Sequence, residues 1–136
     1  MYERYESSNA ENIDAKIIIE RTTVWFSFFI MGLVYLIEDV NNNTFKIGVT
    51  KKDIEKRLKK LQTGNSTELK VRYLYECEYP FRLETMLHTY YKEYKELNEW
   101  FGLPKDEVNI FLDKCVEFDN IIYSLLDNPY WVKHLK

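Results

Sequence analysis

The residues best placed for chemistry are polar side chains that interrupt or border apolar stretches. Tyr35 lies inside GLVYLIE (residues 32–38), and Lys46 lies inside FKIGVT (45–50), two residues before Gly48. A glycine within a strand often marks a place where a ligand or another backbone comes close. Each polar residue also has a structural explanation, because Tyr35 could be a core ring and Lys46 could protect a sheet edge.

An arginine in the next expected helix has a similar position at the edge of an apolar surface. At about 100° per residue, Ile54, Leu58 and Leu61 form one apolar stripe, and Arg57 lies about 60° from Ile54. A residue at that angle either covers the core with its aliphatic stem or points into a cleft. The planar guanidinium of Arg57 would suit a phosphate group.

A carboxylate and a histidine share one face of a later helix. Glu84 and His88 are four residues apart, which places them on the same side. Such a pair can hold a hard cation such as Mg²⁺, or it can pair with a basic residue across the fold. The spacing is not a zinc motif by itself.

Positive charge is concentrated in one part of an acidic chain. The window 46–72 contains nine basic and three acidic residues, a net charge of +6, whereas the whole chain carries −3. A local patch of this kind can bind a polyanion without making the whole surface adhesive. Lys59 and Lys60 are expected to face solvent. The residues expected to contact nucleic acid are Lys46, Lys51, Lys52, Lys56 and Arg57.

The elements that position these residues predict a small α+β domain. Two apolar strands flank the turn DVNNNT and form a hairpin. A helix follows that either Asp53 opens or Thr50 caps, with Asp53 three residues on, and Gly64 ends it. A third strand, up to Pro80, has alternating apolar residues from Leu69 to Tyr79, and helices are expected at about 82–97 and 104–126. The pattern predicts a three-stranded antiparallel sheet flanked by helices.

Length and composition favour one modest domain in a chain of 136 residues. We expect an N-terminal extension over 1–31 that could add strands, a core over 32–104, and a C-terminal helix and tail over 105–136 packed on that core. The two cysteines, Cys77 and Cys115, are expected to be reduced thiols. The 14-residue apolar run 24–37 is shorter than the roughly 20 residues of a membrane-spanning helix. We therefore expect a soluble, cytoplasmic protein without a membrane partner, as a monomer or weak homodimer.

Several short motifs occur in the order and spacing of a known superfamily. LVY (33–35) and KIG (46–48) are followed by RLKKLQTGN, LETMLH and NEWF. Over residues 32–103 the sequence resembles the GIY-YIG nuclease superfamily, and in particular the branch found in phages and DNA viruses. The resemblance implies hydrolysis of phosphodiester bonds in DNA with one divalent ion, Mg²⁺ or Mn²⁺, in the cytoplasm of the host if the chain is viral.

The same resemblance assigns roles to individual residues. Glu84 corresponds to the metal-binding glutamate and Arg57 to the catalytic arginine, while Tyr35 would orient or deprotonate the attacking water. His88 would assist proton transfer or the metal shell. Lys46 replaces the tyrosine of the second motif and would act as a base or a phosphate clamp.

The family asparagine has no clear counterpart in this chain, and the nearest residues are Asn98 and Glu99. A catalytically degenerate nuclease fold that binds nucleic acid or has a regulatory role is therefore the alternative. A protein-interaction module with an aromatic surface is a third possibility.

Overall fold

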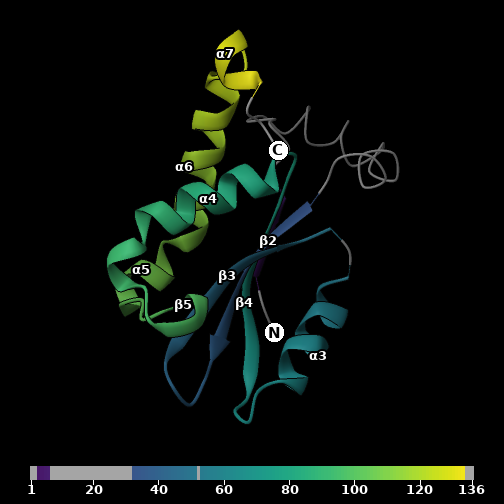
Figure 1. The fold of residues 1–136 in the computed structure, drawn as a ribbon, viewed down its shortest axis with the longest axis vertical. Helices are drawn as coiled ribbons and strands as arrows, with labels where there is room; N and C mark the ends of the chain where they lie inside the picture. Colours follow the sequence, from purple (N-terminus) through teal and green to yellow (C-terminus); the bar gives the residue numbers. More distant parts are fainter. Residues whose placement is uncertain (1–2, 7–31, 52, 134–136) are drawn as a thin grey trace.

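A five-stranded sheet forms the centre of the fold (Figure 1). The computed structural model describes residues 3–6, 32–51 and 53–133. Strand β2 runs antiparallel to β3 and β4, β5 adds to β3, and β1 lies parallel to β4. The strands are β1 (Glu3–Glu6), β2 (Gly32–Asp39), β3 (Thr44–Thr50), β4 (Leu69–Cys77) and β5 (Trp100–Phe101). The α+β class and the antiparallel hairpin are confirmed. The sheet is wider than expected by β1 and β5, and most of the expected N-terminal extension lies outside the described residues.

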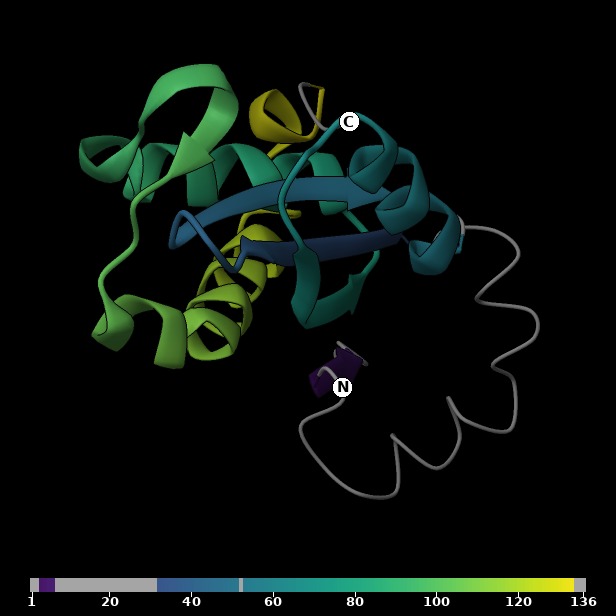
Figure 2. The ribbon, with the colours of Figure 1, turned by 90° about the horizontal axis from the view of Figure 1, so that it is seen from below.

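Helices cover both faces of this sheet. Helix α3 lies on one face, and α4, α5 and α6 lie on the other, as Figures 1 and 2 show. The helices are α3 (Ile54–Thr63), α4 (Pro80–Tyr90), α5 (Lys105–Asn109), α6 (Phe111–Ser124) and α7 (Pro129–Val132), with short 3-10 helices η1 (Lys92–Tyr94) and η2 (Leu97–Glu99). No helix among the described residues is long and apolar enough to cross a membrane.

Helix α3 follows the expectation from the sequence closely. The Asp53 side chain accepts a hydrogen bond of 2.9 Å from the backbone N–H of Glu55, which caps the helix, and Gly64 ends it. Ile54 is buried, and Leu58 and Leu61 pack beside it against the sheet. This packing fixes which side of α3 faces the strands, and thereby the position of Arg57.

Strand β4 differs from the simple alternation. The pairing with β2 shifts between Leu36 and Ile37, so that Arg72 is an extra residue on β4. A β-bulge of this kind changes which face the following side chains use. Val71 consequently packs on the α3 side with Leu74, whereas Tyr73 packs on the opposite side.

Two expected helices have different bounds. Helix α4 begins at Pro80, which occupies the first turn, where its missing N–H costs no hydrogen bond. It ends at Tyr90 instead of Leu97, because the backbone of residues 94–102 folds back on itself and brings β5 to β3. The expected helix 104–126 is divided into α5 and α6 at Ile110.

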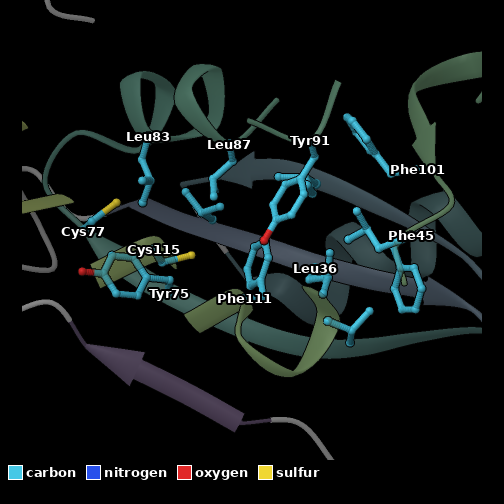
Figure 3. Packing of buried hydrophobic residues seen from close by; sticks show 14 of the residues in the cluster. Leu36, Phe45, Tyr75, Cys77, Leu83, Leu87, Tyr91, Phe101, Phe111 and Cys115 are labelled. Atoms are coloured by element: carbon cyan, nitrogen blue, oxygen red, sulfur yellow. The ribbon is translucent and has the colours of Figure 1, made fainter. Parts of the chain in front are cut away.

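The larger core lies between the sheet and helices α4, α5 and α6 (Figure 3). Tyr91 and Phe111 are fully buried there, and their rings stack with centroids 6.4 Å apart. Cys77 and Cys115 are buried free thiols of the same core, and burial raises the pKa of both. The structure pairs neither cysteine in a disulfide, and burial of both thiols lowers their reactivity.

Two buried tyrosines of this core are expected to respond oppositely to removal of the hydroxyl. The Tyr91 hydroxyl has no hydrogen-bond partner among the described residues, whereas the Tyr75 hydroxyl donates to the Asp119 carboxylate at 2.8 Å. Tyr91→Phe should leave the free energy of unfolding unchanged or raise it by up to about 1 kcal/mol, and Tyr75→Phe should lower it by about 1–3 kcal/mol. Urea denaturation of both variants would measure this difference, and equal destabilisation would contradict it.

Candidate functional site

Three consecutive residues of β3 bring the candidate site residues together. Lys46 forms an ion pair with Glu99, the carbonyl of Ile47 accepts a hydrogen bond from His88, and Gly48 lies against Tyr35. On β3, strand β5 pairs with Phe45 and Lys46 and with no later residue. The edge of β3 is therefore free of β5 from Ile47 onward, and helix α4 comes close to the sheet there.

Tyr35 and Arg57 form one part of the site. Tyr35 is paired with Gly48 across the β2–β3 ladder, and its side chain is fully buried. A Cβ atom at position 48 would lie within 3.0 Å of the Tyr35 ring, so only glycine leaves room for that ring. Arg57 donates from Nε to the Tyr35 hydroxyl oxygen at 3.4 Å. The Tyr35 hydroxyl therefore contacts Arg57 and helps to fix the position of the guanidinium group.

Lys46 is held by the segment that contains β5. Its Nζ lies 3.3 Å from Glu99 Oε2 and 6.0 Å from the centroid of the Trp100 ring. The Lys46 side chain is 14% exposed, whereas that of Glu99 is 69% exposed. Glu99 has φ 69°, in the left-handed region that is uncommon for a residue other than glycine. The ammonium group is therefore positioned by an exposed carboxylate that solvent or a ligand can reach.

Glu84 and His88 project from α4 toward the same edge. His88 donates from Nε2 to the Ile47 carbonyl at 2.9 Å, because a carbonyl oxygen can only accept. Among the described residues Nδ1 has no hydrogen-bond partner. Burial raises the pKa of Glu84, and the charge of Glu99 adds to this effect, while His88 and Lys46 oppose it. Glu84 is therefore a half-buried carboxylate whose negative charge is poorly solvated.

The expected residues form two groups. One contains Tyr35 and Arg57, which are hydrogen-bonded, and the other contains Glu84 with the two basic residues whose charges act on it, His88 and Lys46. Among the described residues no hydrogen bond or ion pair joins Arg57 to Glu84. The Ile47–Gly48 backbone lies between the groups, in contact with His88 on one side and Tyr35 on the other.

The remaining basic residues lie around these groups. Lys51 is exposed, with its Nζ 5.5 Å from the centroid of the Phe81 ring, and Lys56 is exposed on α3. Lys52 lies outside the described residues. Lys59 and Lys60 face solvent, as expected. The sequence patterns did not identify Glu99 and Trp100 as neighbours of Lys46, since only the short β5 pairing brings residues 53 positions apart together.

The described residues offer a metal ion few ligands. In the part of the chain that the structure describes, no group of three or more His, Cys, Asp or Glu side chains could hold a metal. The half-buried Glu84 carboxylate, with the exposed Glu99 carboxylate nearby, is compatible with an ion such as Mg²⁺ or Mn²⁺, which often retains water and binds substrate phosphate oxygens. Glu84 fits that ion only in company with a phosphate, so affinity without nucleic acid should be low.

The fold is a small α+β domain in which a basic strand–helix unit lies beside a half-buried carboxylate. The chain belongs to the T5orf172 domain family, a phage-associated domain related to nuclease folds, whose family model matches residues 32–116. The match covers every element from β2 to α5 and the first part of α6. Comparisons with curated proteins and with solved structures found no match.

Proposed function

We propose that this protein is a metal-dependent endonuclease of the GIY-YIG kind that hydrolyses phosphodiester bonds in DNA. The observation that carries the proposal is the arrangement around the short backbone stretch Ile47–Gly48. His88 contacts the Ile47 carbonyl, and Tyr35, which holds Arg57, contacts Gly48. Glu84 lies within electrostatic reach of His88 and of Lys46, the residue before Ile47. Its family is one of nuclease-like and DNA-binding modules. A phosphate at the open edge of β3 would find cationic side chains on one side and a carboxylate on the other.

Each residue has a role that its surroundings support. Glu84 would hold the Mg²⁺ or Mn²⁺ ion, which when bound supplies positive charge to the phosphate oxygens. Arg57, steadied by the Tyr35 hydroxyl, would stabilise charge that develops on the phosphoryl group. Lys46 would exchange Glu99 for a substrate phosphate.

His88 and Tyr35 would support the reaction mainly by holding neighbouring groups in place. The Nδ1 atom of His88 is free to accept a proton or a hydrogen bond, since Nε2 is committed to the Ile47 carbonyl. Tyr35 is buried, so its action on the reacting water would require an opening of the edge. In the closed arrangement it acts through Arg57.

The second candidate is a module that binds nucleic acid without cleaving it. The ion pair between Lys46 and Glu99 favours this alternative, because it neutralises the residue that replaces the second family tyrosine. Such a module would retain salt-dependent DNA binding and lack nicking activity in any metal.

A matched pair of substitutions tests the proposed endonuclease. Supercoiled plasmid should be nicked in Mg²⁺ or Mn²⁺ and remain intact in EDTA. Arg57→Gln should slow nicking by roughly 100-fold, because the donor beside the phosphate is lost. Lys60→Gln removes the same charge from the exposed face of α3 and should have less than about a threefold effect. The absence of nicking by the wild type, or equal rates for the two variants, would refute the endonuclease.

A further inference from the structure

A cleft extends from the candidate site along α4 toward β5. It has a volume of about 330 Å³ and is lined by Glu84, Thr85, His88, Thr89, Lys92, Lys95 and Phe101. Glu84, His88 and Lys92 are spaced by four residues, so they follow one side of α4 and its continuation η1. The cleft therefore has the Glu84 carboxylate toward one end and two lysines toward the other.

The two lysines are available to an incoming anion. Neither Lys92 nor Lys95 has a hydrogen bond or ion pair with a side chain among the described residues. The Thr85 and Thr89 hydroxyls donate to backbone carbonyls of α4, at 3.0 Å in both cases, so they do not serve as donors to a ligand. The positive charge that this cleft offers to a ligand thus comes from Lys92 and Lys95.

Acidic neighbours of these lysines face elsewhere. Glu93 does not line the cleft, and Glu96 lines a separate hollow on the opposite side of the 95–101 segment. The carboxylate of Glu96 lies in the space above Gly102. In the segment that connects α4 to β5, Lys92 and Lys95 therefore line the cleft beside the candidate site, whereas Glu96 lines a different hollow.

We propose that this cleft binds the backbone of the nucleic-acid strand, with Lys92 and Lys95 as a second phosphate-binding site beside the one at Glu84. The inference rests on the proposed function, which places one phosphate of the strand beside a divalent ion on Glu84. The eight residues from Glu84 to Lys92 span about 12 Å, which matches roughly three to four nucleotides of a B-form strand. A strand that lies between the two phosphate sites would follow α4.

The chemistry of the cleft favours a polyanion with regularly spaced phosphates over an acidic peptide. One end of the cleft carries the Glu84 carboxylate, which would repel a glutamate-rich chain. A phosphodiester strand can bridge that carboxylate through a divalent ion and still reach the lysines at the other end. The lysines also lie outside the basic window 46–72, so they extend the positive surface beyond α3.

The test compares two double variants that lose the same charge. Lys92→Gln combined with Lys95→Gln alters the cleft wall, and Lys59→Gln combined with Lys60→Gln alters the exposed face of α3. Binding of a 20-base-pair DNA duplex would be measured by fluorescence anisotropy in EDTA, from low to moderate salt, with circular dichroism as a check of folding. Affinity falls as salt rises, so a plot of log affinity against log salt has a negative slope. The magnitude of this slope should become smaller by about 1 to 2 for the cleft variant and by less than about 0.5 for the control.

The outcomes separate this inference from the endonuclease itself. If the wild type binds DNA with the expected slope difference but never nicks it, the second phosphate site stands and the endonuclease fails. If the wild type nicks DNA and both double variants bind and cleave alike, the endonuclease stands and the lysine site is refuted. The site is also refuted if the wild type does not bind DNA at low salt. It is refuted as well if the substitution of Lys92 and Lys95 weakens the binding of polyglutamate but not the binding of DNA.

Discussion

Replacing Glu84 with glutamine is expected to reduce DNA nicking by roughly 1,000-fold, while the folded protein becomes slightly more stable at neutral pH. Loss of the carboxylate removes the proposed metal ligand, and a bound metal contributes several kcal/mol of charge stabilisation in such reactions. The gain in stability has a different cause. Burial and the nearby charge of Glu99 make the charged form of Glu84 unfavourable, and glutamine carries no charge. A residue maintained only for structure would not combine these two responses.

The pH dependence of this stability difference has a defined sign. The pKa of Glu84 in the folded protein lies above its ordinary value of 4.5, so the folded state holds this proton more tightly than the unfolded state. The favourable contribution of protonated Glu84 is complete below pH 4.5 and disappears as the pH rises through the higher folded pKa. Glu84→Gln should therefore exceed the wild type in stability at pH 7, and the difference should decrease toward pH 4.

Thermal unfolding and plasmid nicking measure the two effects on the same variant. Glu93→Gln serves as the control, since Glu93 is exposed on η1 and lies outside the cleft. In the presence of a short DNA duplex, Mg²⁺ should raise the melting temperature of the wild type and of the control, but not of Glu84→Gln. Unchanged nicking by Glu84→Gln would eliminate Glu84 as the metal ligand.

Gly48→Ala is expected to have the largest effect on stability and to abolish most of the activity as well. The added methyl group would overlap the hydroxyl end of the buried Tyr35 ring, which has no exposed surface into which it could move. Overpacking of a core costs about 1–3 kcal/mol, and the displaced Tyr35 would also release Arg57. A displacement of about 1 Å at a catalytic group can reduce the rate about 100-fold.

Gly64 provides the matched control for this substitution. A Cβ atom at Gly64 would meet only the Leu61 carbonyl oxygen, at 3.8 Å, and the residue has φ −90°, which alanine adopts without strain. Gly64→Ala should leave stability within about 1 kcal/mol of the wild type and preserve nicking. If Gly48→Ala behaves like Gly64→Ala in urea denaturation, the close contact with Tyr35 is not a constraint on the fold.

The sequence predicts those features that depend on local periodicity. The apolar residues of β2 are buried and the stripe on α3 packs against the sheet as expected, so the sequence alone could place Arg57 at the boundary of the core. The Asp53 cap and the Gly64 terminus follow from the preferences of these residue types.

Features that depend on distant pairing could not be predicted in this way. Alternation along β4 does not reveal the extra residue Arg72, because the bulge exists only relative to the partner strand β2. Tyr90, Tyr91 and Tyr94 have a spacing that favours a longer helix, but β5 pairing requires the chain to leave the helix after Tyr90. The contact of Glu99 with Lys46 depends on that same turn and therefore was not expected.

Tyr35 and Glu84 belong to different layers of the molecule. Tyr35 is part of the core under α3, whereas Glu84 lies on α4, which packs in the core on the opposite face of the sheet. The sheet lies between them. A change in the packing of α3 can therefore move Arg57, which contacts Tyr35, while the packing of α4 against the other face keeps Glu84 in place. Substitutions in α3 are thus expected to alter one part of the candidate site without disturbing the other.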